Sequence, residues 1–228
     1  MCRGKNQCSE LGTNPALWSK ISPLPSLEWF EGQLDIFQEA VSEFVGGDRV
    51  GCINTLSEIR TDEMRDWYIE HGQMSGKHRT YELDIPTPIP LAESERDPLR
   101  APKKYESQVF IRDGFRCRYC GIRLVSNRVL NTFIKSLNSA SFVKGPRNLD
   151  THGIIIIFNP VADHVVPWNL GGKTNLDNLV ASCGPCNYGK DRFTIEQIGI
   201  ENPFLRNPIV DRWDGLISQL DGIKRNAH

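Results

Sequence analysis

The stretches Cys117-Arg118-Tyr119-Cys120 and Cys183-Gly184-Pro185-Cys186 place two cysteine pairs of the CxxC type in the second half of the chain. Sixty-two residues separate the two pairs, so they can meet only through tertiary structure. Four thiolates at this spacing are typical of a tetrahedral structural zinc site, with Cys117, Cys120, Cys183 and Cys186 as its ligands. Such a site supplies folding free energy on the order of 10 kcal/mol. The alternative is four unrelated buried cysteines.

Between the two cysteine pairs lie Asp163 and His164, and Asn187 directly follows the last cysteine. A neutral imidazole can act as a general base toward water, and a neighbouring metal ion can act as a Lewis acid on a phosphate. Adjacent strand residues point to opposite faces, so Asp163 and His164 can serve one site only where the strand is twisted or bulged. The sequence therefore predicts a hydrolytic metal site beside the zinc site.

Composition and charge agree with a folded protein that acts on a polyanion. The 228 residues are 39% hydrophobic and 24% charged, which excludes a disordered chain. The net charge is −1, but residues 1–100 carry −7 and residues 101–228 carry +6. A basic half that contains the cysteine, histidine and aspartate residues suits a nucleic acid. The alternative is an uneven distribution of ordinary surface charge.

The odd number of cysteines, seven in all, argues for reduced thiols and metal binding. No apolar segment follows the first residues, and the longest apolar run, at 154–158, is too short to cross a bilayer. We therefore expect a cytoplasmic protein without a membrane segment.

Helical patterns dominate the acidic half. A broad apolar stripe predicts a helix over 27–45 with Ser26 as its cap, Asp48 can cap a second helix, and Thr61 starts a third that runs to about His71. The alternating prolines from Pro86 to Pro90 then forbid a helix. The expected organisation is an acidic helical accessory module at 1–80, a proline-rich linker at 81–103, a catalytic domain at 104–195 with an inserted helix near 127–138, and a helical extension at 196–228.

Short elements are predicted around the cysteine pairs. Ser126 can cap the inserted helix, and the apolar runs at 154–158, 162–166 and 179–181 predict strands. A helix should begin near Pro185 and continue to about residue 192. Further along, Thr194 and Gln197 form a capping-box pattern, and a terminal helix should begin near Asp211.

The ordered motifs of residues 105–195 resemble the zinc-bearing HNH endonucleases. The segments that carry the resemblance are Phe115-Arg116-Cys117-Arg118-Tyr119-Cys120-Gly121, Asp163-His164-Val165-Val166-Pro167, Gly171-Gly172, Asn175-Leu176-Asp177-Asn178-Leu179-Val180 and Cys183-Gly184-Pro185-Cys186-Asn187-Tyr188-Gly189-Lys190. The resemblance implies an α+β fold, in which a zinc-stapled ββα-metal nuclease core is joined to the N-terminal helical module. It also implies cleavage of DNA with Mg²⁺ or Mn²⁺, leaving 5′-phosphate and 3′-hydroxyl ends.

Residue roles follow from the same resemblance. His164 corresponds to the general base, Asp163 and Asn187 to the ligands of the catalytic metal, and Asn178 to the residue that braces the loop and orients the base. The chain departs from the family in two ways. Asn187 stands where many members have histidine, and the 42 residues between Cys120 and Asp163 exceed what the compact core needs.

The function expected from these residues is a metal-dependent DNA endonuclease or nickase, with restriction or phage defence among its possible settings. The alternative is a non-catalytic zinc module that binds nucleic acid. Five basic residues flank the motifs and are candidates for phosphate contacts: Arg116, Arg118, Lys173, Lys190 and Arg192. For residues 1–80 we expect binding to a partner protein, self-association or restraint of the nuclease.

Overall fold

The apolar stripe over 27–45 forms the first helix, as predicted. The computed structural model describes residues 19–24, 26–72, 85–86 and 88–227, and the stripe lies on α1 (Glu28–Val45). The aromatic rings of this helix pack on α5 (Asn127–Leu137). The centre of the Phe133 ring lies 5.5 Å from the ring centres of both Phe37 and Phe44. The side chains that α1 buries include Phe30, Leu34, Phe37, Val41 and Phe44.

The other elements are short. After α1 come α2 (Arg49–Ser57), α3 (Thr61–Trp67), α4 (Glu106–Arg112), α5, α6 (Gly153–Phe158), β1 (Pro160–His164), β2 (Leu179–Cys183), α7 (Gly184–Lys190) and α8 (Leu220–Arg225). The predicted inserted helix is therefore confirmed as α5, and the predicted strands at 162–166 and 179–181 as β1 and β2, each with shifted ends.

The predicted helix caps are correct in part. Asp48 caps α2, because its Oδ1 accepts a hydrogen bond of 2.7 Å from the backbone nitrogen of Gly51. Ser26 and Ser126 do not cap: Leu27 stands at the N-cap of α1, and the side chain of Ser126 makes no capping bond to α5. The third helix begins at Thr61 and continues from Trp67 as a π-helical turn to Gly72.

The apolar run at 154–158 is a helix, α6, and the prediction of a strand was wrong. His152 caps this helix by accepting a hydrogen bond of 3.3 Å from the backbone nitrogen of Ile154. Every residue of α6 is buried, so no polar face marks the helical period. Periodicity alone cannot distinguish a short buried strand from a short buried helix.

The C-terminal helix begins later than predicted. Gly215 and Leu216 both adopt left-handed backbone angles, with φ of 69° and 63°, which interrupts any helix that starts near Asp211. α8 therefore starts only at Leu220. Asn226 follows it and donates hydrogen bonds of 2.8 Å to the carbonyl oxygens of Phe44 and Val45, at the end of α1. Thr194 and Gln197 exchange the predicted capping-box bonds, around a turn.

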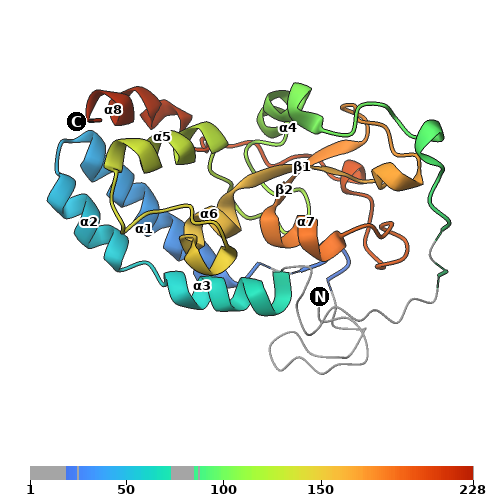
Figure 1. Ribbon diagram of the computed structural model, residues 1–228, viewed down its shortest axis with the longest axis horizontal. Coiled ribbons are helices and arrows are strands. Elements are labelled where there is room, and N and C mark those ends of the chain that lie inside the picture. The colour runs from blue at the N-terminus through green and yellow to red at the C-terminus, as the bar shows by residue number, and fades with distance from the viewer. Residues whose placement is uncertain (1–18, 25, 73–84, 87, 228) are drawn as a thin grey trace.

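The sheet consists of two antiparallel strands. Pro160 pairs with Cys183 and His164 with Leu179, and α7 follows β2 without a loop. In Figure 1 the sheet, α4 and α7 occupy one end of the molecule, while α1, α2, α5 and α8 occupy the other. Helix α6 contacts both α3 and α7, and one cluster of buried hydrophobic side chains spans both ends. The structure is therefore of the mixed α+β class.

Among the described residues, no helix is both long enough and apolar enough to span a bilayer.

Candidate active site

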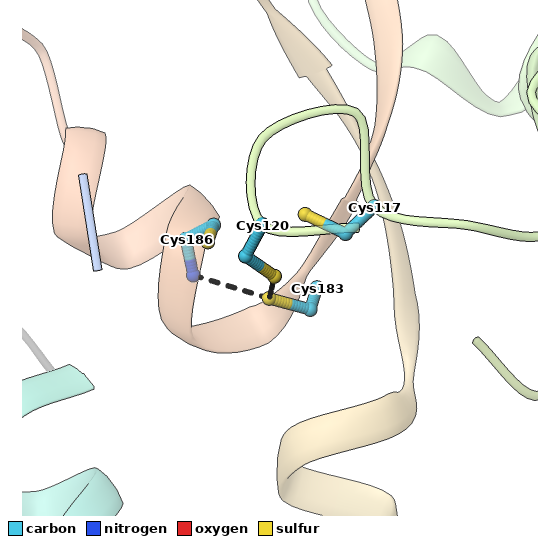
Figure 2. Close-up of side chains that lie close together, drawn as sticks. All are labelled: Cys117, Cys120, Cys183 and Cys186. Carbon is cyan, nitrogen blue, oxygen red and sulfur yellow. Dashed lines mark hydrogen bonds between the residues drawn. The ribbon is translucent and has the colours of Figure 1, made fainter. Parts of the chain in front are cut away.

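The four cysteines of the two CxxC pairs lie together, and their side chains converge (Figure 2). Cys117 and Cys120 lie on a tight turn, Cys183 ends β2, and Cys186 lies in the first turn of α7. All four sulfur atoms lie within 4.8 Å of one another, and the Sγ atoms of Cys120 and Cys183 are 3.7 Å apart. A tetrahedral zinc ion with Zn–S bonds of about 2.3 Å separates its sulfur ligands by roughly 3.8 Å. The cluster therefore fits zinc.

Local backbone geometry shapes both halves of this cluster. In the first turn, the backbone nitrogen of Cys117 donates to the carbonyl of Ile122 at 2.9 Å, and Gly121 takes a φ of 81° that favours glycine. In the second, the backbone nitrogen of Cys186 donates to Cys183 Sγ at 3.4 Å. Cys117, Cys183 and Cys186 are buried, and none of the described cysteines forms a disulfide.

Asp163 is held by Tyr119 and by Lys190 of α7. Its Oδ2 accepts a hydrogen bond of 2.7 Å from the hydroxyl of Tyr119, which lies between the two cysteines of the first pair. The Nζ atom of Lys190 lies 3.3 Å from the same oxygen and donates to the carbonyl of His164 at 2.8 Å. Burial, together with the charge of Asp163, raises the pKa of Tyr119 well above its usual value, so this hydroxyl remains a donor.

His164 ends β1 and is held through its ring. Its Nε2 lies 2.8 Å from the hydroxyl of Thr174, whose backbone nitrogen donates to Asp97 Oδ2 at 3.0 Å. Burial lowers the pKa of His164 below its usual value, so the imidazole is neutral near pH 7. Hydrogen bonds from the backbone nitrogens of Thr174 and Leu99 lower the pKa of Asp97, which keeps that carboxylate charged.

The side chain of Asn178 bonds to two points of the loop between β1 and β2. Its Oδ1 accepts from the backbone nitrogen of Val166 at 2.8 Å, and its Nδ2 donates to the carbonyls of Val166 and Lys173 at 3.0 Å each. Gly172 makes this close packing possible, because a Cβ atom there would lie 1.8 Å from the Val166 carbonyl oxygen. The loop that carries Thr174 is thus fixed against the end of β1.

Asp163 and His164 both line one open cavity of about 440 Å³, although they are neighbours on a strand. The cavity lies where β1 ends and the chain turns into the braced loop. Its remaining lining residues are Arg96, Arg100, Pro102, Pro167, Trp168, Asn169, Lys190, Asp191 and Arg192. Basic side chains thus outnumber acidic ones around the carboxylate and the imidazole.

Asn187, the second expected metal ligand, does not line this cavity. It is half-buried on α7, and its side chain makes no hydrogen bond to the part of the chain that the structure describes. The contacts of Asp163 with protein groups in that same part of the chain all use Oδ2. The Oδ1 atom of Asp163 and the amide oxygen of Asn187 thus have no hydrogen-bond partner in the described part of the chain, and both are oxygen atoms of the type that Mg²⁺ and Mn²⁺ prefer.

The five candidates for phosphate contacts fall into two groups. Arg116 pairs with Asp211 at 2.6 Å, Arg118 is buried and donates to the carbonyls of Pro203 and Arg206, and Lys190 is buried against Asp163. These three side chains are engaged within the protein. Arg192 and Lys173, in contrast, are exposed, and Arg192 lines the cavity.

Sequence reasoning missed several residues that support the site. They are Tyr119, Asp97, Thr174, Arg96 and Arg100. Of these, only Tyr119 stands inside a motif, between the cysteines of the first pair. Asp97, Arg96 and Arg100 lie in the segment predicted as a linker, where the sequence contains no sign of contact with the site.

Taken together, the fold and site define a mixed α+β protein with a four-cysteine cluster beside an Asp-His cavity. Residues 160–193 match the family model of the HNH endonucleases, a span that runs from the start of β1 past α7. The suspected family resemblance is therefore confirmed for this segment, which supports a nuclease-type enzyme at the level of the family. No curated protein and no solved structure matches the chain.

Proposed function

We propose that this protein is a metal-dependent DNA endonuclease or nickase with a zinc-stapled ββα-metal core. The observation that carries the proposal is the meeting of Asp163 and His164 at one cavity, within the segment that matches the HNH family. The strand–strand–helix order of β1, β2 and α7 agrees with such a core. An HNH segment also implies a nucleic acid as the substrate.

In the proposed reaction His164 acts as the general base. When its Nε2–H is donated to the hydroxyl oxygen of Thr174, Nδ1 carries the lone pair that accepts a proton from the attacking water. The lowered pKa of His164 keeps this lone pair available near neutral pH. Asn178 holds the loop of Thr174 and so preserves the orientation of the ring.

Asp163 and Asn187 are the residues that we propose to hold the catalytic Mg²⁺ or Mn²⁺. When bound, this ion would supply Lewis-acid stabilisation of charge on the phosphodiester. Tyr119 and Lys190 orient the carboxylate of Asp163 through its Oδ2. Arg192 and Lys173 are the exposed candidates for contacts with the DNA backbone.

The four cysteines are proposed to hold one structural zinc ion. They lie apart from the cavity, since no cysteine is among its lining residues. Their proposed role is to fix the turn that carries Tyr119 and the start of α7, and thereby to place Asp163 and Asn187.

A supercoiled-plasmid assay on the purified, zinc-loaded protein tests the proposed function. We expect nicked or linear product with Mg²⁺ or Mn²⁺ and none with EDTA, with product ends that ligase can rejoin because they carry 5′-phosphate and 3′-hydroxyl groups. If the protein bound DNA but cleaved it with neither Mg²⁺ nor Mn²⁺, the result would favour the alternative, a non-catalytic zinc module. The settings that we propose for the activity are restriction or phage defence in a cytoplasm.

We also propose that residues 1–80 act as an accessory module that binds a partner protein or a second copy of the chain. Phe37 and Phe44 of α1 pack on α5, so deletion of the module would uncover the core. The test is therefore light scattering on the full chain. A full chain that stays monomeric and binds no partner protein would contradict this proposal.

A further inference from the structure

The segment 91–102, which we call the strap, is docked against the candidate active site. The backbone nitrogen of Leu91 donates to the carbonyl of Asn169 at 2.9 Å, and Trp168 Nε1 donates to the carbonyl of Asp97 at 2.8 Å. The carboxylate of Asp97 accepts from the backbone nitrogen of Thr174, the residue that contacts His164. These bonds tie the strap to the same loop that positions the proposed general base.

Two arginines of the strap contact the ring of Trp168. The guanidinium carbons of Arg96 and Arg100 each lie 5.1 Å from the centre of that ring, and both arginines line the cavity with Asp163 and His164. The Nε and Nη2 atoms of Arg96 donate hydrogen bonds to the carbonyl oxygen of Leu91, at 2.8 and 2.6 Å. This arginine is therefore partly committed to holding the strap in place.

Arg100 is placed differently. It is exposed, and within the described part of the chain its guanidinium makes no hydrogen bond or ion pair. Its guanidinium lies over the ring of Trp168, a contact that uses no N–H group. A guanidinium presents its donors in a planar fork that matches a phosphate group. Arg100 thus combines a place in the cavity lining with unused donors.

We propose that the strap forms one wall of the DNA-binding groove and that Arg100 binds a backbone phosphate next to the bond that is cleaved. The inference rests on the proposed function and adds a substrate-binding residue from outside the segment that matches the family. Around the cavity, Arg96, Lys190 and Arg192 add positive charge, while Asp163 and Asp191 are the acidic lining residues. A DNA strand in this groove would therefore meet a net positive charge beside the carboxylate of Asp163.

Binding of a fluorescein-labelled DNA duplex, measured by anisotropy over a series of NaCl concentrations without added magnesium, tests this proposal. Each lost phosphate contact makes the negative slope of log K against log [salt] shallower by about 0.9. We expect Arg100→Ala to show that loss and to weaken binding by about tenfold or more, since a hydrogen-bonding group that contacts a charged phosphate is removed. Arg100→Lys should keep the wild-type slope because it keeps the charge.

Arg128→Ala is the matched control. Arg128 is exposed on α5 and does not line the cavity, so its removal deletes the same charge away from the groove. Equal slopes for Arg100→Ala and Arg128→Ala, in a wild type that binds and cleaves DNA, would overturn the role of the strap alone. A wild type that neither binds the duplex nor cleaves plasmid would overturn the proposed function together with this inference.

Discussion

The hydroxyl of Tyr119 donates a hydrogen bond of 2.7 Å to Oδ2 of Asp163, and this bond joins the four-cysteine cluster to the cavity. Tyr119 is completely buried, and its neighbours in sequence are Arg118 and Cys120. The turn that presents two of the four clustered cysteines therefore also presents a donor to the proposed metal ligand. A zinc ion bound by the four cysteines would therefore influence the proposed reaction through the side chain of Tyr119.

Tyr119→Phe should slow cleavage while leaving zinc binding intact. The substitution removes only the hydroxyl, and a hydrogen bond to a charged group contributes about 1.5–3 kcal/mol. If the transition state depends fully on that bond, the single-turnover rate should fall by about tenfold or more. Zinc content, measured by metal analysis, should stay at the wild-type value. An unchanged rate would show that Tyr119 does not position Asp163.

Cys183→Ala should abolish zinc binding and destabilise the fold. Loss of the roughly 10 kcal/mol that such a site supplies should lower Tm by roughly 20–40 °C in a chain of this size. Cys52→Ala is the control, because Cys52 is a buried cysteine of the core on α2 and outside the cluster. Burial raises the pKa of Cys52 to about 11, so it is not a thiolate near neutral pH. Equal zinc content in the two variants would contradict the assignment of the cluster.

Two glycine substitutions should have opposite effects on stability. A Cβ at Gly172 would lie 1.8 Å from the Val166 carbonyl oxygen, so Gly172→Ala should displace the loop braced by Asn178 and lower the free energy of unfolding. Gly32 lies inside α1, and a Cβ there would meet nothing within 4 Å. Gly32→Ala should therefore raise the free energy of unfolding by about 0.5–1 kcal/mol. Urea denaturation of both variants measures the two changes.

Stability should fall as the pH falls below about 6.5, because of His152. Burial lowers the pKa of His152 to about 3, so between pH 6.5 and 3 the unfolded chain binds a proton at this position that the folded chain does not. Over this range, His152 lowers the free energy of unfolding by up to about 1.4 kcal/mol for each unit by which the pH falls. His152→Gln should show a shallower decline between pH 7 and 5 in urea denaturation. Identical slopes for the variant and the wild type would contradict this account.

The sequence was sufficient for elements whose pattern has one interpretation. The stripe on α1 has a clear helical period, and Asp48 has a capping side chain in the right place, so both were predicted. Helix α6 has no polar face, since every residue from Gly153 to Phe158 is buried, and its period was therefore invisible. The delayed start of α8 depends on the left-handed backbone of Leu216, a residue type that gives no such signal.

The candidate site was predictable where it is made of local motifs. The cysteine cluster and the Asp163-His164 pair lie within short motifs and were named in advance. The supporting residues come from distant segments. Asp97 meets Thr174, and Arg100 meets Trp168, only through the docking of the strap. Tertiary contacts of this kind leave no periodic or motif signal in one sequence.

The central claim is that His164 is the general base of a metal-dependent nuclease. Its most direct test is the initial rate of supercoiled-plasmid cleavage by His164→Ala at saturating Mg²⁺, compared with the wild type. Removal of a general base costs about 10²–10⁴-fold in rate, and we expect a loss in that range. Zinc content and Tm should stay at wild-type values, which would show that the fold is intact. A His164→Ala rate equal to that of the wild type would contradict the account.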